Sequence, residues 1–421
     1  MHNLTLEKFI KERGKLDDKE FNISDIYLYE LIFGNNINDS QKITGFFLNL
    51  ILNLFSAITI LKCKILKVRK LNYVITNKNS PTRLDFRSEK IIANVDLHSC
   101  INLIRNKDFF SSIIVYFKYP NVIFYSGIES IFIGFKKKNN SNKIQRYKQF
   151  HRVIFKIRNF YEKIFLFLKL EKILMIDDQR VYPIFLDIAV KNNIKTFGYM
   201  HYKFTKYVVS TSKYEFDNFL VWSDYFKRKL FDINKNYKRK FLFYSELNIK
   251  KFRTVKNKKN GILYIIDLDS NLDHFQKLYN YLDKEKYNLF LKFKPQKSLD
   301  SNWKIFCNKN NIIFFENDSL SYILSNYKIS FFVASISSLL LEASLHNCIP
   351  IKIKTPNDFF DDVIGDKVVQ LLELNKFSKI NFLLDNMLTI KGNLISKINK
   401  KVWSIKNNKN NINIFCNKFN S

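Results

Sequence analysis

The sequence predicts an α/β protein with two Rossmann-like domains, and three observations indicate this class. Short apolar segments alternate with polar breaks from Leu71 onward, and a second such series begins at Gly261. Between them, residues 246–260 are charged and lack an apolar period, which is typical of a linker. A chain of 421 residues, 46% of them hydrophobic, is long enough for two cores and too apolar for a disordered protein.

The formal net charge of +32 is the largest global feature of the chain. A field of this sign concentrates anions such as nucleic acid, acidic membrane surfaces and phosphorylated small molecules. Because no Arg-Gly tract, zinc-finger spacing or ribonucleoprotein motif accompanies the charge, a nucleic-acid binder is the weaker interpretation. A peripheral enzyme on an anionic membrane fits better.

The cysteines are odd in number and far apart, at Cys63, Cys100, Cys307, Cys348 and Cys416. They form no CxxC pair and no metal-ligand spacing, so reduced thiols in a cytoplasmic protein are expected. The N-terminal residues show no apolar core behind their charges, so no secretory signal is expected.

The most hydrophobic stretch is Ile43 to Leu61, and the basic segment KCKILKVRK follows it. Its length approaches the roughly 20 residues that span a bilayer. Three interpretations are open: a helix buried in the domain, a helix lying in the membrane interface, and a membrane span.

Four short runs in the first half are expected to be strands. They are LNYVIT (71–76), KIIANVDL (90–97), SSIIVYFKY (111–119) and NVIFYSG (121–127). An apolar helix around 153–170 follows them.

An acidic pair follows the next expected strand. Residues 172–176 are predicted to be a strand that stops at Asp177 and Asp178, and His201 comes just past the strand at 194–199. The carboxyl ends of adjacent parallel strands meet at one edge, where open α/β sheets bind ligands. A carboxylate there can take the proton of an attacking hydroxyl, and the histidine can orient an acceptor. In the alternative, the aspartates cap the following helix and His201 is a polar loop residue.

In the second half, residues 262–266 are predicted to be a buried strand, and the segment NLFLKFKPQKS (288–298) to supply another strand that ends in Lys294 and Pro295. Asp267 and Asp269 have the spacing of a metal-binding pair, but their loop is of a common type. We therefore expect no metal site.

The most informative stretch follows the strand end at Phe331 to Val333. Ser335, Ser337 and Ser338 precede the apolar segment LLLEAS, which is predicted to be a helix with a serine cap. A strand, a small-residue turn and a helix N-terminus together can bind phosphate through backbone N–H groups. Glu342 is then placed to accept hydrogen bonds from a ribose. The alternative is an ordinary βαβ unit with serine caps and an exposed glutamate.

With the strand IPIKI at 349–353, this block resembles the nucleotide-sugar half of GT-B glycosyltransferases, particularly bacterial enzymes of capsule and lipopolysaccharide synthesis. The resemblance implies that Ser337 and Ser338 meet the donor phosphates and that Glu342 meets the nucleoside. It also places Lys294 where these enzymes usually have a histidine that neutralises the leaving phosphate.

The segment KTFGYMHYKF resembles the Gly-Tyr-Gln-His-Gly strand end of surface-carbohydrate transferases. Gly198, Tyr199 and His201 match this pattern, whereas Met200 and Tyr202 depart from it. The departure at Tyr202 removes the glycine that would let the backbone approach a ligand closely.

The resemblance implies two domains facing a cleft, with the acceptor bound by residues 1–250, the nucleotide sugar by residues 251–395, and a tail at 396–421 that packs back on the first domain. We expect metal-independent transfer, without a cofactor, from a nucleotide sugar to a cell-surface glycan or lipid-linked acceptor. Asp178, or alternatively Asp177 or His201, would deprotonate the acceptor. The expected location is the cytoplasmic face of the plasma membrane, with an anionic membrane surface and no nucleic acid as partner. A polyol-phosphate transferase and a non-catalytic binder of anionic glycan or nucleic acid are the alternatives.

Overall fold

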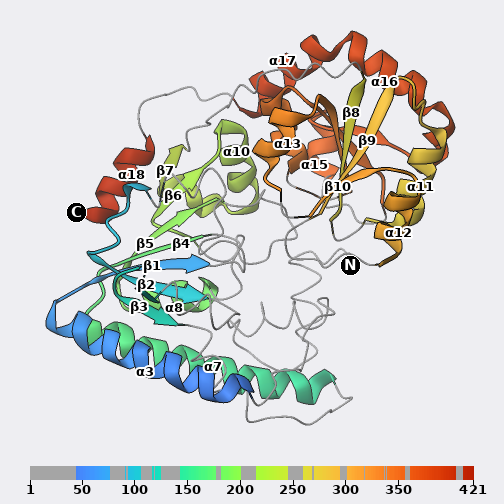
Figure 1. The fold of residues 1–421 in the computed structure, drawn as a ribbon. Coiled ribbons are helices and arrows are strands. Elements are labelled where there is room, and N and C mark those ends of the chain that lie inside the picture. The colour runs from blue at the N-terminus through green and yellow to red at the C-terminus, as the bar shows by residue number, and fades with distance from the viewer. Residues whose placement is uncertain are drawn as a thin grey trace. The chain divides into compact units, whose positions relative to one another are not determined.

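The computed structural model describes most of the chain, and its described residues form two compact units (Figure 1). One unit lies within residues 1–247 and 405–421, and the other within residues 248–404. The described residues are 44–75, 91, 93–105, 116–117, 119–124, 143–176, 182–200, 215–244, 259–267, 270–293, 301–316, 318–335, 337, 339–355, 361–403 and 411–421.

The first unit contains a seven-stranded sheet in the order β3-β2-β1-β4-β5-β6-β7. All neighbouring strands are parallel. The direction in which successive strands are added to the sheet reverses between β1 and β4. The strands are β1 (Lys70–Ile75), β2 (Cys100–Arg105), β3 (Val122–Phe124), β4 (Lys172–Ile176), β5 (Lys195–Tyr199), β6 (Asn218–Val221) and β7 (Phe241–Tyr244).

Helices cover this sheet. They are α3 (Thr44–Ile65), α7 (Lys143–Leu168), α8 (Tyr182–Lys191), α10 (Asp224–Ile233), the 3₁₀ helix η2 (Lys235–Arg239) and α18 (Asn411–Asn420). α3 packs on β3 and against α7, whereas α18 packs on β6 and β7. Phe415 of α18 contacts the rings of Phe197 and Phe243, and the Lys172 ammonium donates to the Lys418 carbonyl, 3.0 Å away, in the last turn of α18. The last helix thereby completes the core of the first unit.

Two runs of this unit that were expected to be strands contain helical residues and no strand where the structure describes them. In SSIIVYFKY (111–119) the helical residues are Tyr116 and Phe117. The run KIIANVDL was expected to be a strand, but Ile91, Ala93 and Asn94 are helical. The strand β2, in contrast, was not expected, because Asn102 interrupts its apolar run. Asn102 is fully buried there, and its amide donates to the carbonyls of Leu97 and Pro120 at 3.0 and 2.7 Å.

The helix α3 contains the hydrophobic stretch at 43–61 from Thr44 on. Leu52 and Ser56 are buried on the sheet side of this helix. The Ser56 hydroxyl donates to the Leu52 carbonyl at 2.7 Å and accepts the N–H of Phe124 at 3.0 Å, which ties α3 to β3. None of the described helices, α3 included, combines the length and the apolar character that a membrane span needs.

The second unit contains a six-stranded parallel sheet in the order β10-β9-β8-β11-β12-β13. Counted from β8, this is the order 3-2-1-4-5-6 of the Rossmann fold, whose switch point lies between the first and fourth strands. The strands are β8 (Asn260–Ile265), β9 (Tyr287–Lys292), β10 (Ile313–Phe315), β11 (Ile329–Ala334), β12 (Ile349–Ile353) and β13 (Gln370–Leu372). The predicted α/β class is confirmed.

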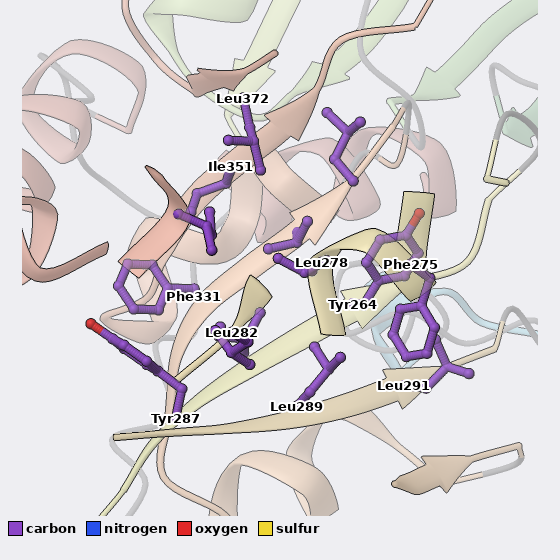
Figure 2. Packing of buried hydrophobic residues seen from close by; sticks show 14 of the residues in the cluster. Tyr264, Phe275, Leu278, Leu282, Tyr287, Leu289, Leu291, Phe331, Ile351 and Leu372 are labelled. Atoms are coloured by element: carbon purple, nitrogen blue, oxygen red, sulfur yellow. The ribbon is translucent and has the colours of Figure 1, made fainter. Parts of the chain in front are cut away.

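The helices of this unit are α11 (Leu272–Tyr281), α12 (Ser301–Lys309), α13 (Leu320–Asn326), α14 (Leu339–Glu342), η3 (Ala343–His346), α15 (Asp361–Gly365), η4 (Leu374–Lys379), α16 (Ile380–Thr389) and α17 (Lys391–Val402). One face of the sheet forms the main core (Figure 2). Leu289 and Leu291 of β9 and Phe331 of β11 point into it because alternate strand residues share a face. Tyr264 packs edge-on against Phe275 of α11, with ring centroids 5.0 Å apart.

Two glycines are required by close packing inside the strands. A Cβ atom at Gly198 would lie 2.5 Å from the buried ring of Phe216, and one at Gly261 would lie 2.4 Å from the Lys328 carbonyl oxygen. We expect Gly198→Ala and Gly261→Ala each to lower the free energy of unfolding by about 3 kcal/mol, because neither neighbour can move freely. Urea denaturation measures this loss.

Gly392 in α17 is the matched control, since a Cβ atom there meets nothing within 4 Å. Gly392→Ala is expected to raise stability by about 0.5–1 kcal/mol, because alanine has the higher helix propensity. Equal urea midpoints for all three variants would contradict the packing argument.

Candidate functional site

The candidate site lies at the switch point of the second sheet. β8 and β11 are neighbours, with Tyr264 in register with Val333, and their carboxyl ends lead to Asp267 and Ser335. The crevice outside such strand ends is where open α/β sheets bind ligands. The side chains that follow β8 and β11 therefore form the candidate site.

Asp267 joins the two loops. Its carboxylate accepts the backbone N–H of Ser335 at 3.0 Å and the hydroxyl of Ser270 at 3.1 Å. The Ser270 hydroxyl in turn accepts the N–H of Asp267 at 2.8 Å, which closes the turn after β8. Because Asp267 is fully buried, these bonds offset the desolvation of its charge. This linking role of Asp267 was not predicted from the sequence, in which Asp267 stood out only for its metal-type spacing from Asp269.

The metal alternative gains no support at this position. Asp269 lies outside the described residues, and among those that are described no three His, Cys, Asp or Glu side chains gather closely enough to hold an ion. The expectation of metal-independent chemistry stays a prediction.

The serine turn is more enclosed than the sequence implied. Ser335 and Ser337 are 0% and 1% exposed, and Ser338 lies outside the described residues. Within the described chain the Ser335 hydroxyl has no hydrogen-bond partner, while the Ser337 hydroxyl accepts the Leu339 N–H at 3.4 Å. Ser337 thus serves as a weak helix cap. One backbone donor of the turn, the Ser335 N–H, is already bound by Asp267 and is not available to a phosphate.

The helix after this turn is shorter than expected. α14 has four residues and continues as the 3₁₀ helix η3, which ends at Asn347 with a φ of 56°. A left-handed residue at this position closes a helix end, and the N–H of Cys348 returns to the Ala343 carbonyl at 2.9 Å. A single turn has a small dipole, so an anion bound at this position would be held by backbone N–H groups more than by the helix dipole.

Glu342 is buried. It is therefore not the exposed glutamate expected of an ordinary βαβ unit, and its carboxylate is not open to a ribose in this structure. It is 4% exposed at the end of α14, a helix that packs on β11 and β12. Its side chain is therefore buried within the second unit.

Two buried lysines were missed by sequence reasoning. Lys292 of β9 and Lys352 of β12 are 7% and 2% exposed, and they donate to the carbonyls of Asp318 and Ile353 at 2.6 and 3.1 Å. Lys292 pairs with Ile265 and Lys352 with Ala334, so the lysines lie one strand to either side of the switch point. Burial lowers the pKa of Lys292, against the opposing charge of Asp318. The signal in the sequence was a lone lysine in each apolar run, LFLKF and IPIKI.

His274 lies in the first turn of α11, just after the loop that Asp267 begins. Burial, and secondly the charge of Lys277, lowers its pKa, so its imidazole is neutral at pH 7. Among the described residues its Nδ1 atom has no hydrogen-bond partner. A neutral imidazole in this position can accept or donate a hydrogen bond.

The predicted catalytic residues Asp177, Asp178 and His201, and the predicted donor residue Lys294, all lie outside the described residues. The strands that precede the first three are described. β4 and β5 are parallel neighbours whose last residues, Ile176 and Tyr199, are in register, as the sequence predicted.

The packing of the first unit explains why methionine stands at position 200, where the Gly-Tyr-Gln-His-Gly pattern has glutamine. Its side chain is 1% exposed, and its carbonyl oxygen accepts the indole N–H of Trp222 at 2.8 Å. A buried apolar side chain at this position holds the strand end in the core.

Comparison with known proteins gives a result for the fold. No protein-family model and no curated protein sequence matches the chain. Among solved structures, the chain is similar to a putative UDP-N-acetylglucosamine 2-epimerase from Listeria monocytogenes, with a TM-score of 0.51 and 8% identity over 83% of this chain and 94% of that one. It is also similar to CalG4, the calicheamicin glycosyltransferase, with a TM-score of 0.50 and 8% identity over 84% of this chain and 95% of that one. At such low identity these similarities show the fold alone, which is the two-domain α/β fold of GT-B enzymes.

Proposed function

We propose that the protein is a glycosyltransferase that moves a sugar from a nucleotide-activated donor to a cell-surface glycan or lipid-linked acceptor. The observation that supports this most is the buried link between Asp267 and Ser335 at the switch point of the second sheet. It holds the loops after β8 and β11 in one arrangement, and a binding site requires such preorganisation. The two similar structures are those of a putative UDP-N-acetylglucosamine 2-epimerase and of the calicheamicin glycosyltransferase, which fits this proposal.

The burial of Ser335, Ser337 and Glu342 narrows the proposed donor contacts. We assign direct contact with the donor phosphates to Ser338, Lys294 and backbone N–H groups of the turn. Ser335, Ser337 and Glu342 are proposed to support the turn through their buried packing.

Charge neutralisation of the leaving nucleotide is proposed to come from the protein without a metal. Lys294 supplies a positive charge, and the buried Lys292 and Lys352 add to the positive field at this edge. Preorganised charges in an enclosed site stabilise a developing anion more effectively than charges in water.

In the first unit, Asp178, or alternatively Asp177 or His201, is proposed to take the proton of the acceptor hydroxyl. The acceptor oxygen then bonds to the anomeric carbon while the bond from that carbon to the donor phosphate breaks. The leaving nucleotide carries away the bonding electrons, so the charges balance. We place this reaction at the cytoplasmic face of the plasma membrane, in capsule or lipopolysaccharide synthesis.

A thermal-shift panel of UDP-, GDP-, CDP- and TDP-sugars together with CDP-glycerol tests the donor. We expect one sugar nucleotide, at 100 times its Kd, to raise the unfolding midpoint by roughly 5–10 °C, since saturation at that level adds about 2.7 kcal/mol. Ser338→Ala is expected to remove most of this shift. Ser325→Ala, an exposed serine in the same unit, is the matched control and should leave it unchanged.

Protection by CDP-glycerol alone would favour the polyol-phosphate transferase. If no nucleotide protects the protein, or if Ser338→Ala retains the full shift, the donor site proposed here is wrong.

A further inference from the structure

We propose that the exposed apolar face of α3 docks on an anionic lipid bilayer. This inference rests on the proposed function for its biological setting, and it assigns a surface of the protein to the membrane partner. The docking face consists of Leu50, Leu54, Ile58, Leu61 and Ile65 of α3 and the neighbouring Phe167 of α7.

α3 is apolar on two opposite sides. The side that packs on the sheet buries Leu52, Ser56, Thr59 and Cys63, a spacing of three to four residues. The other side carries the five α3 residues of the docking face, which repeat at the same spacing. At about 100° per residue they occupy an arc of roughly 80° on the helix.

This second side is open. Leu50, Leu54, Ile58, Leu61 and Ile65 are 56%, 59%, 50%, 58% and 78% exposed. A solvated helix of a soluble domain normally has charged residues in these positions. A continuous row of exposed leucine and isoleucine indicates an interaction surface.

α7 extends the docking face on one flank. The two helices are in contact and run side by side (Figure 1). The Lys64 ammonium lies 4.7 Å from the centre of the Phe167 ring and donates to the Phe167 carbonyl. Phe167 is 45% exposed, so an aromatic ring stands beside the aliphatic row.

The charges around this face are basic. Lys62 and Lys64 project on either side of the aliphatic row by helix spacing, and residues 44–70 contain no Asp or Glu. On α7, Lys156 and Lys163 are exposed as well. Long lysine side chains beside an apolar row can extend to lipid phosphates while the row enters the acyl boundary.

An exposed apolar row with lysines beside it favours an anionic bilayer over the other possible occupants of the docking face. A second copy of the chain also carries a net charge of +32 and is repelled. Nucleic acid would use the lysines but would leave the leucine and isoleucine row in water. An anionic bilayer supplies both a hydrocarbon boundary and negative headgroups, and a helix lying in its plane buries its apolar face by about 5–10 Å.

The test is co-sedimentation of the full chain with vesicles of phosphatidylglycerol and phosphatidylcholine, and with vesicles of phosphatidylcholine alone. We expect binding to the anionic vesicles that weakens with added salt, and at least tenfold weaker binding to the neutral ones. Leu54→Gln, Ile58→Gln and Leu61→Gln combined should reduce the partition coefficient on anionic vesicles more than tenfold.

The matched control combines Ile305→Gln, Phe382→Gln and Ile390→Gln, which are 63%, 65% and 53% exposed in the second unit. This control should bind vesicles like the unmodified chain. Because all six residues are exposed, both triple variants should fold, and circular dichroism checks this.

Three results would overturn the inference: no binding of the unmodified chain to anionic vesicles, equal binding by the α3 triple variant, or self-association in sedimentation velocity that the α3 variant abolishes. The last result would assign the face to a second copy. The nucleotide thermal shift of the α3 variant reports separately on the proposed function, since none of its three residues lies in the second unit.

Discussion

Asp267→Ala is expected to lower the free energy of unfolding by about 3–5 kcal/mol and to abolish nucleotide-sugar protection. The substitution removes two hydrogen bonds to a buried charge, each worth about 1.5–3 kcal/mol, and leaves the Ser335 N–H without an acceptor. The loops after β8 and β11 then lose their shared anchor at the switch point. Urea denaturation measures the stability loss, and the nucleotide thermal shift measures the loss of binding.

Asp267→Asn separates the contribution of the carboxylate charge to stability from that of the side chain's size. An asparagine of the same size can accept from the Ser335 N–H or the Ser270 hydroxyl with one oxygen only, so about half of the stability loss is expected. Glu285→Ala is the control, because its side chain is 93% exposed in the same unit. If Asp267→Ala unfolds at the same urea concentration as Glu285→Ala, the buried link does not hold the site.

Raising the pH from 8 to 10.5 is expected to unfold the protein. All five thiols are fully buried, and burial raises the pKa of Cys63, Cys100 and Cys307 to about 11 and that of Cys348 and Cys416 to about 12. A thiol of the unfolded chain has a pKa of 9.0. Above pH 9 the unfolded state therefore releases protons that the folded state keeps, and each thiol costs about 1.4 kcal/mol per pH unit.

Three lysines act in the opposite direction. Burial lowers the pKa of Lys172, Lys292 and Lys391 below 10.5, so their contribution to stability rises with pH up to that value. Five thiols outweigh three lysines, and the net slope is negative above pH 9. Three of the thiols lie in the first unit, which is expected to unfold first.

The measurement is the free energy of unfolding in urea at intervals from pH 8 to 10.5, with a reductant present. Cys348→Ala combined with Cys416→Ala should flatten the slope above pH 9, whatever its effect at pH 8. A stability that stays level between pH 9 and 10.5 would contradict this expectation.

The strands of both sheets were largely predictable from the sequence. The segments 172–176, 194–199 and 349–353 were predicted within a residue of β4, β5 and β12, because a strand buried on both faces must be a continuous apolar run. β2 was not predicted, since the amide of Asn102 is satisfied by carbonyls from other segments of the chain. A polar residue in a strand is acceptable only when such partners exist, and a sequence does not display them.

The candidate site was predictable only in its position. The serine turn and the strand end at Asp267 were placed at the right edge of the right strands, because parallel strands end together. Tertiary packing, which no local sequence pattern describes, decided the burial of Ser335 and Glu342. It also decided the burial of Lys292 and Lys352 on either side of the switch point. The docking face of α3 also could not be predicted from the sequence, because one hydrophobic stretch supplied both a buried side and an exposed side of the helix.

By itself, the sequence determined the α/β class and the strands that carry polar residues at their carboxyl ends, because burial on both faces demands unbroken apolar runs. Only the tertiary structure decided which of those polar groups meet. Asp267 and Ser335 are 68 residues apart in the chain and come together because β8 and β11 pair at the switch point. Sheet pairing is non-local, and it alone brings the Asp267 carboxylate to the Ser335 N–H.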